Sequence, residues 1–147
     1  MQLKTTQVLS LLIVASFALS SCADAVVELD QGDCLDLAEG MLTNGQFEYE
    51  GLSAISCSQP HNAEVVGVLR LPEKDFPGME TLTVRAEEFC PTAFANYIGK
   101  EAKDSILDLV PLSPTEESWT RANDRTIICL AISQHEKIPK TFKNSRR

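Results

Sequence analysis

The sequence predicts a single small α+β domain, with a mostly antiparallel sheet, one main helix packed on it and two disulfides. Short strand-like segments lie before and after one segment of helical periodicity, an order typical of α+β folds. Four cysteines follow residue 30, and an even number in an exported chain indicates two disulfides. Residues 31–136, which we expect to form the domain, suffice for one hydrophobic core.

The N-terminal segment has the pattern of a bacterial lipoprotein signal. Lys4 precedes an apolar segment at residues 8–19, which runs into Leu19-Ser20-Ser21-Cys22. Small residues before such a cysteine resemble a lipobox, in which the thiol is joined to diacylglycerol and the chain is cut just before it. We therefore expect removal of residues 1–21 and a lipid anchor on Cys22 at the extracytoplasmic face of the cell membrane.

Residues 22–30 would then be the lipidated N-terminus and a short tether. An uncleaved transmembrane helix needs about 20 apolar residues, more than this segment offers. Ordinary secretion, with cleavage after Ser21 or Ala23, remains the alternative.

The first half of the domain reads as strands separated by turns. Apolar and acidic residues alternate over residues 33–37, residues 54–57 form a second short strand, and residues 64–71 are rich in Val and Leu. Asn44-Gly45 marks a tight turn in the loop at residues 40–51. Pairing the first two strands would bring Cys34 close to Cys57.

The second half contains the helix and the most apolar strand. Apolar residues recur at three and four positions from Leu82 to Ile98, with Pro91 predicting a kink or a restart. Residues 105–110 predict a strand, and residues 113–116 a single helical turn capped by Ser113. Residues 126–133 are almost continuously apolar, which favours a central strand buried on both faces.

Three pairings of the four domain cysteines are possible, and we favour Cys34–Cys57 together with Cys90–Cys129. In the second pair, Cys129 on the central strand would reach Cys90 on the packed helix. The chain has no Cys-x-x-Cys pair, which argues against a zinc tetrahedron built on such pairs and against a thioredoxin-like redox centre.

Charge is unevenly distributed along the chain. The net charge is −8 overall, yet residues 137–147 carry five basic side chains and no acidic one, so residues 22–136 carry seven basic against 21 acidic side chains. An acidic body repels phosphate, and we expect no nucleic-acid partner. The tail has no apolar period and is predicted to be disordered. It would attract anionic lipid or wall polymers, or simply be solvated.

The order of these landmarks resembles the septum-formation domain family, cell-envelope domains found as lipoproteins or behind one membrane helix. The resemblance rests on Gly32-Asp33-Cys34, on the stretch at residues 55–65 with its Cys-x-x-Pro-His-x-x-Glu pattern, and on Cys90, Pro114, Trp119, Asp124-Arg125 and Cys129. One departure is Ala122-Asn123 before the Asp-Arg pair, where the family usually has Gly. The resemblance supports the disulfides and implies a link to cell division, without an activity or a ligand.

His61 and Glu64 are the first candidates for recognition of a ligand or partner. Three positions apart, they could present two metal ligands on a helix, but Pro60 before them and a Val-rich strand after them make a helix unfavourable. We expect His61 to hold the turn through hydrogen bonds to Glu64 or to a backbone carbonyl.

Trp119 and Arg125 are the remaining candidates. Trp119, the single tryptophan, would stack on a sugar ring of a wall polymer or cap the core, and the Asp124-Arg125 pair would fix the turn into the last strand. The chain has no Gly-x-Ser-x-Gly elbow and no cysteine that we expect to be free. We therefore predict no catalytic residue, no metal and no cofactor.

These observations favour a non-catalytic binding or scaffold protein, anchored through diacylglycerol on Cys22, that contacts division or wall-synthesis proteins. The alternative is an envelope enzyme or metal-binding lipoprotein that uses His61 and Glu64.

Overall fold

The computed structural model describes residues 28–39, 41 and 52–147. The lipobox, the anchor at Cys22 and the Asn44-Gly45 turn predicted above lie outside these residues. The secondary structure elements are, in chain order, β1 (Cys34–Leu35), β2 (Ala63–Arg70), α2 (Met79–Ile98), the 3-10 helix η1 (Ala102–Asp104), β3 (Asp108–Leu112), α3 (Glu116–Arg121) and β4 (Thr126–Ile132).

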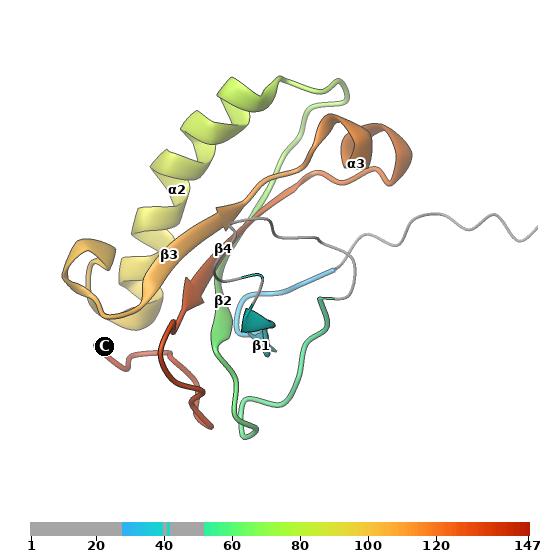
Figure 1. The fold of residues 1–147 in the computed structure, drawn as a ribbon. Coiled ribbons are helices and arrows are strands. Elements are labelled where there is room, and N and C mark those ends of the chain that lie inside the picture. Colours follow the sequence, from blue (N-terminus) through green and yellow to red (C-terminus); the bar gives the residue numbers. More distant parts are fainter. Residues whose placement is uncertain (1–27, 40, 42–51) are drawn as a thin grey trace, which may run out of the picture.

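The four described strands form one antiparallel sheet in the order β1-β2-β4-β3 (Figure 1). The two long strands pair along their whole length, from Ala63 opposite Ile132 to Arg70 opposite Thr126. The apolar run of β4 is buried at every position from Ile127 to Ile132, because side chains on both faces of the sheet are covered. The predicted α+β class and the inner position of this strand are confirmed.

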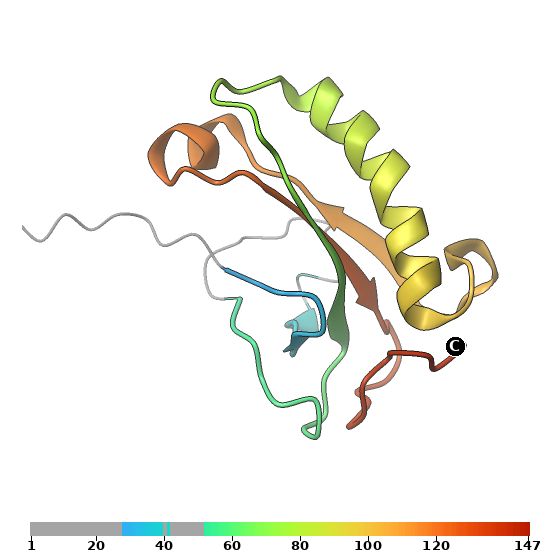
Figure 2. The same ribbon diagram turned by 180° about the vertical axis from the view of Figure 1, so that it is seen from behind.

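Helix α2 covers one face of the sheet, and both views show it running along the strands (Figures 1 and 2). Its buried side chains recur at three and four positions, as predicted, although the helix begins at Met79 and continues through Pro91. The disulfide between Cys90 and Cys129 joins it to β4, confirming that pairing. At Gly67 the sheet approaches the helix so closely that an added Cβ would lie 2.6 Å from the Cβ of Ala93.

The opposite face of the sheet is covered by irregular segments of the chain rather than by a helix. Leu29 and Leu37, which flank β1, and Leu52 pack with Val65 and Leu130 in a second buried apolar cluster. The predicted disulfide between Cys34 and Cys57 is present and joins β1, at the edge of the sheet, to the segment that follows Leu52. Cys34 pairs with Glu64, whose carboxylate bonds to Tyr97 of α2, so this bridge lies on the α2 face at the edge of the sheet.

Several predicted boundaries differ from the structure. The strand expected at residues 33–37 contains only two paired residues, and that expected at residues 54–57 is reduced to one bridge between Ile55 and Cys34. The strand expected at residues 105–110 spans Asp108–Leu112, since its register follows β4. Thr115, rather than Ser113, caps the short helix α3 through the backbone N–H of Ser118.

The C-terminal segment, residues 137–147, corrects the prediction of a disordered tail. Ile138 pairs with His61 in an isolated bridge, and Phe142 is completely buried. The backbone N–H groups of Asn144 and Arg146 donate to the carbonyl groups of Tyr97 and Ile98, so the segment caps the last turn of α2. It is part of the domain.

Within the described part of the chain, no helix has both the length and the apolarity needed to cross a membrane.

Candidate functional site

The side chain of Glu64 in β2 is buried, and its carboxylate is bonded by groups from two other parts of the domain. Its Oε1 accepts hydrogen bonds from the hydroxyl groups of Tyr97 and Thr141, the latter at 2.6 Å, and its Oε2 accepts one from the backbone N–H of Phe142. Glu64 is 0% exposed, and burying an unpaired charge is unfavourable. The three donors, from α2 and the C-terminal segment, replace the water that a surface carboxylate would bind.

His61 lies beside this carboxylate in a fixed orientation. Its Nδ1 is 2.8 Å from the carbonyl oxygen of Gln59, which only accepts, so Nδ1 carries a hydrogen and donates it. Its Nε2 has no hydrogen-bond partner among the described residues and lies 4.0 Å from Oε2 of Glu64. His61 therefore holds the turn through a backbone carbonyl, as expected from the sequence, and its other nitrogen faces the carboxylate.

Burial of the tyrosine, followed by its hydrogen bond to Glu64, raises the pKa of Tyr97 to about 12. The neutral phenol is thus the form that the folded domain favours. The phenol keeps its hydrogen and donates it to the carboxylate throughout the neutral range.

Cys34 completes a compact set of potential metal ligands with these two side chains. One ligand atom each from Cys34, His61 and Glu64 lie within 4.8 Å of one another, and all three residues are buried. The sulfur of Cys34 is bonded to that of Cys57, and a disulfide sulfur lacks the thiolate charge that metals bind. With this bridge formed, the set offers one imidazole nitrogen and one carboxylate.

Sequence reasoning missed the residues that close this site. Tyr97 belongs to the apolar face of α2, and Thr141 and Phe142 belong to the segment predicted to be disordered. The ring of Phe142 stacks on the imidazole of His61, with centroids 5.1 Å apart. The four-residue spacing of Ile138 and Phe142 was the one available signal, and it is weak in a basic segment.

Trp119 and Arg125 lie together at the other end of the sheet. Trp119 is 2% exposed, so its ring offers no face to a sugar, and its Nε1 donates to the carbonyl of Lys74 at 3.0 Å. The guanidinium of Arg125 lies 3.9 Å from the centroid of the indole ring and donates to the carbonyl groups of Trp119 and Lys74. This pair caps the core, the second of the two roles considered for Trp119.

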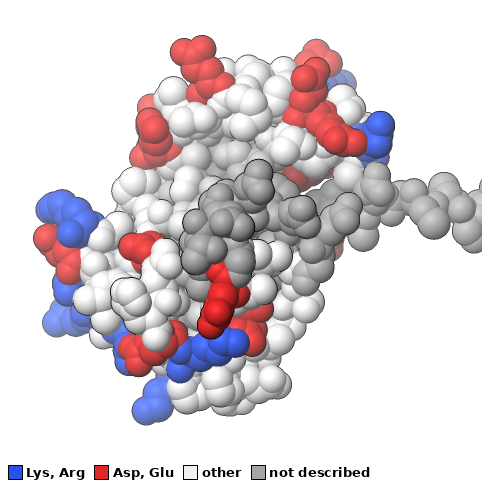
Figure 3. All heavy atoms as spheres, viewed as in Figure 1, with Lys and Arg blue, Asp and Glu red and all other residues white. Residues whose placement is uncertain are grey.

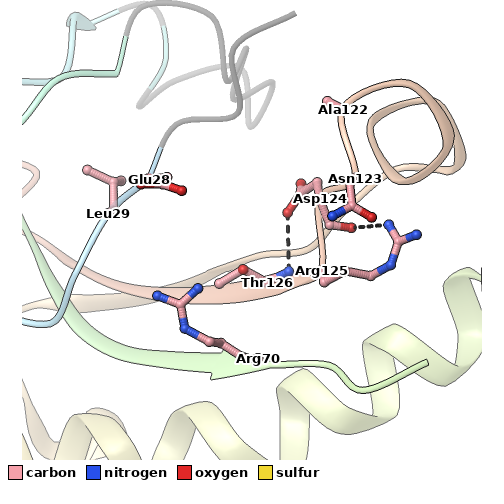
Figure 4. A pocket seen from close by; sticks show the side chains of 8 residues that line it. All are labelled: Glu28, Leu29, Arg70, Ala122, Asn123, Asp124, Arg125 and Thr126. Atoms are coloured by element: carbon pink, nitrogen blue, oxygen red, sulfur yellow. Dashed lines mark hydrogen bonds between the residues drawn. The ribbon is translucent and has the colours of Figure 1, made fainter. Parts of the chain in front are cut away.

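The Asp124-Arg125 turn lines a pocket of about 280 Å³ at this end (Figure 4). The carboxylate of Asp124 accepts from the backbone N–H of Thr126 and from the hydroxyl of Ser118, which fixes the entry into β4 as predicted. Arg70 extends on the side of Glu28 and Leu29, whereas Arg125 extends away from them. The pocket has no compact set of potential metal ligands among the described residues.

A model of the family described as "Septum formation" matches residues 18–129. The chain belongs to the septum-formation family. The match covers most of the chain, including His61, Glu64 and all four disulfide cysteines. No curated protein and no solved structure matches the chain.

Membership of this family associates the chain with the cell envelope and with cell division. The family match ends within β4, whereas the segment that covers His61 and Glu64 lies beyond it. In this septum-formation domain, the His61 and Glu64 motif is therefore covered by residues that lie outside the part matched by the family model.

Proposed function

We propose that this septum-formation domain is a lipid-anchored, non-catalytic binding or scaffold protein of the cell envelope. In this proposal it contributes to septum formation by contacting division or wall-synthesis proteins. The observation that carries the proposal is that the chemically distinctive side chains, those of His61, Glu64 and Trp119, are buried and bonded within the fold. The outer surface is then the part of the molecule that meets a partner.

The anchor is supported by the lipobox and by the position of the first described residues. Glu28 follows Cys22 by six positions, a reach of at most about 20 Å. Glu28 lines the pocket beside Thr126, the first residue of β4. The lipid would therefore hold the domain close to the membrane by the end of the sheet at which β4 begins.

The C-terminal segment supplies a basic surface with a fixed position. Two of its cations are paired: Nζ of Lys137 lies 2.7 Å from Asp36, and a guanidinium nitrogen of Arg147 lies 2.6 Å from Glu136. The remaining three are exposed and have no carboxylate partner among the described residues, and we call them the basic tail surface: Lys140, Lys143 and Arg146. In Figure 3, Lys and Arg side chains gather toward the end where the chain terminates.

The location of this surface favours a wall polymer over a lipid as its anionic partner. The basic tail surface follows the end of β4, whereas Glu28 lies near its start, and a seven-residue strand is about 23 Å long. The first described residues and the C-terminal segment thus lie toward opposite ends of the sheet (Figures 1 and 2). The basic tail surface is therefore closer to the phosphate-bearing polymers of the wall than to the lipid headgroups at the anchored end of the domain.

Binding of the unlipidated chain to two anionic probes tests this partner. We expect binding to poly(glycerol phosphate), weakened by salt and reduced about tenfold or more when all three cations of the basic tail surface are changed to Glu. The matched control reverses three exposed cations at the other end of the sheet: Arg70, Lys74 and Arg121. Stronger binding to phosphatidylglycerol vesicles than to the polymer would favour lipid, and equal losses in both variants would reject a localised site.

Photo-crosslinking in living cells tests the proposed protein contacts. A photoreactive amino acid at Lys143 should capture a division or wall-synthesis protein, whereas one at Val84, exposed on α2, serves as the position-matched control. Capture should fall when Cys22→Ala removes the anchor. If purified protein turns over a wall precursor, the non-catalytic proposal is wrong.

A further inference from the structure

The buried set at Cys34, His61 and Glu64 has the support that protein metal sites require. Their ligand atoms lie within 4.8 Å of one another, and Nε2 of His61, although completely buried, has no hydrogen-bond partner among the described residues. Most buried polar atoms have a hydrogen-bond partner. An unpaired nitrogen that faces a carboxylate 4.0 Å away is therefore a candidate ligand for a bound ion.

The imidazole is already arranged as a metal ligand. A histidine that binds a metal generally donates its other ring hydrogen to a backbone carbonyl or a carboxylate, which fixes the ring and leaves a lone pair toward the metal. Nδ1 of His61 donates in this way to Gln59, so in the neutral ring Nε2 holds the lone pair. The stacked ring of Phe142 further restricts the imidazole.

The carboxylate is equally well supported. Hydrogen bonds to metal-binding carboxylates orient them, and Glu64 receives three, from Tyr97, Thr141 and the backbone of Phe142. These donors hold the carboxylate beside His61, and no Lys or Arg of the described residues forms an ion pair with it.

The disulfide controls whether sulfur joins this set. We propose that reduction of the Cys34–Cys57 bridge creates a zinc site whose ligands are Cys34, Cys57, His61 and Glu64. Two thiolates, one imidazole and one carboxylate are ligand types that Zn²⁺ accepts in a four-coordinate site. The proposal goes beyond the proposed function, because binding of a polymer or protein at the surface needs no metal.

The chemistry balances with a dithiol as the reductant. The dithiol gives two electrons and two protons to the Cys34–Cys57 bridge, the S–S bond breaks, and the dithiol becomes a disulfide. Zn²⁺ then displaces the two thiol protons as it binds. Cys34 is buried but Cys57 is half-exposed, so the reductant reaches the bridge from the Cys57 side.

The second bridge is a matched internal control. Cys90 and Cys129 are both buried between α2 and β4, and no cluster of potential metal ligands includes them among the described residues. Mild reduction should therefore open the Cys34–Cys57 bridge first, and zinc should affect only that pair.

Zinc binding to the full unlipidated chain tests the proposal. After mild reduction with a phosphine and removal of free metal, we expect one Zn²⁺ per chain, against none for the oxidised protein. Zinc should slow alkylation of Cys34 and Cys57 about tenfold or more, and Co²⁺ in its place should give a thiolate-to-metal absorption band. His61→Ala should weaken zinc binding by at least about tenfold.

Measurements on the unaltered chain keep the test decisive if variants misfold. Circular dichroism reports whether the reduced chain remains folded, and if it does not, zinc should restore the folded spectrum. The proposal is wrong if the reduced chain binds no zinc, if zinc leaves alkylation of Cys34 and Cys57 unchanged, or if the Cys34→Ser/Cys57→Ser variant binds zinc equally well.

Discussion

Phe142, near the end of the chain, stacks on the imidazole of His61, two residues before β2, and both side chains are completely buried. The backbone N–H of the same phenylalanine donates to Glu64, three residues further along the chain from His61. One residue of the C-terminal segment therefore contacts both polar residues of the buried motif. The segment completes the core at a point that the sheet and α2 leave open.

Phe142→Ala should destabilise the domain by about 3 kcal/mol, because it removes a buried ring and leaves a cavity over His61. Urea unfolding followed by circular dichroism measures the change. Ile106→Ala is the control, since Ile106 is 67% exposed and its truncation should alter the free energy of unfolding by no more than about 0.5 kcal/mol. Equal effects for the two variants would mean that the C-terminal segment is not part of the cooperative fold.

Glu64→Gln should lower the free energy of unfolding by about 2–4 kcal/mol. The substitution removes the charge that three hydrogen-bond donors stabilise. The new amide NH₂ group can only donate, so it cannot accept a hydrogen bond from the donors that it faces. Glu87→Gln on the exposed face of α2 is the matched control and should change it by about 0.5 kcal/mol or less. If Glu64→Gln is neutral, the carboxylate is not an organising group of the core.

The raised pKa of Tyr97 predicts that the folded domain loses stability in alkaline solution. Burial raises the pKa of its phenol from 10.0 to about 12 in the folded domain, so between these values the folded state binds more protons than the unfolded state. Stability contributed by the neutral phenol is therefore complete below pH 10 and is lost as the pH rises toward 12. Tyr97→Phe should flatten this part of the pH–stability curve relative to the unaltered protein.

Absorbance titration gives an independent measurement of the same ionisation. The chain has two tyrosines, and the difference between the titrations of the unaltered protein and Tyr97→Phe isolates one of them. A Tyr97 that ionises at its ordinary pKa would contradict the buried hydrogen bond to Glu64.

The elements specified by local pattern were predictable from the sequence. Helical periodicity identified the face of α2 that carries Cys90, and the apolar run of β4 placed Cys129 inside the sheet, so their disulfide followed from two independent patterns. The pairing of Cys34 with Cys57 was likewise predictable, although the strands around them are much shorter than expected.

The C-terminal segment could not be predicted because distant residues stabilise it. Its two buried side chains, Ile138 and Phe142, lie among exposed basic residues, so the segment has the composition of a solvated tail. Glu64 in β2 and the end of α2 supply its hydrogen bonds, and those partners come together only in the folded sheet. The burial of His61 and Glu64 could not be predicted either, because Phe142 of the same segment covers both residues.

Cys22→Ala should release the protein from the membrane fraction without unfolding it. The thiol is the predicted site of the lipid, and the domain cysteines are already paired as Cys34–Cys57 and Cys90–Cys129. Fractionation measures the release, and the thermal unfolding midpoint of the soluble variant measures the fold. A variant that remains in the membrane fraction would show that the anchor lies elsewhere.

Gly67→Ala should destabilise the domain by about 1–3 kcal/mol, because α2 leaves no space for a methyl group on β2. The added Cβ would lie 2.6 Å from Cβ of Ala93 and 3.2 Å from the ring of Phe89, so helix and sheet must separate. Ala93→Gly removes the nearer obstacle, at a helix-propensity cost of about 1 kcal/mol on its own. The double variant should therefore be more stable than the sum of the two single effects, as measured by urea unfolding. Strict additivity would mean that the packing distance between α2 and β2 does not restrict this position.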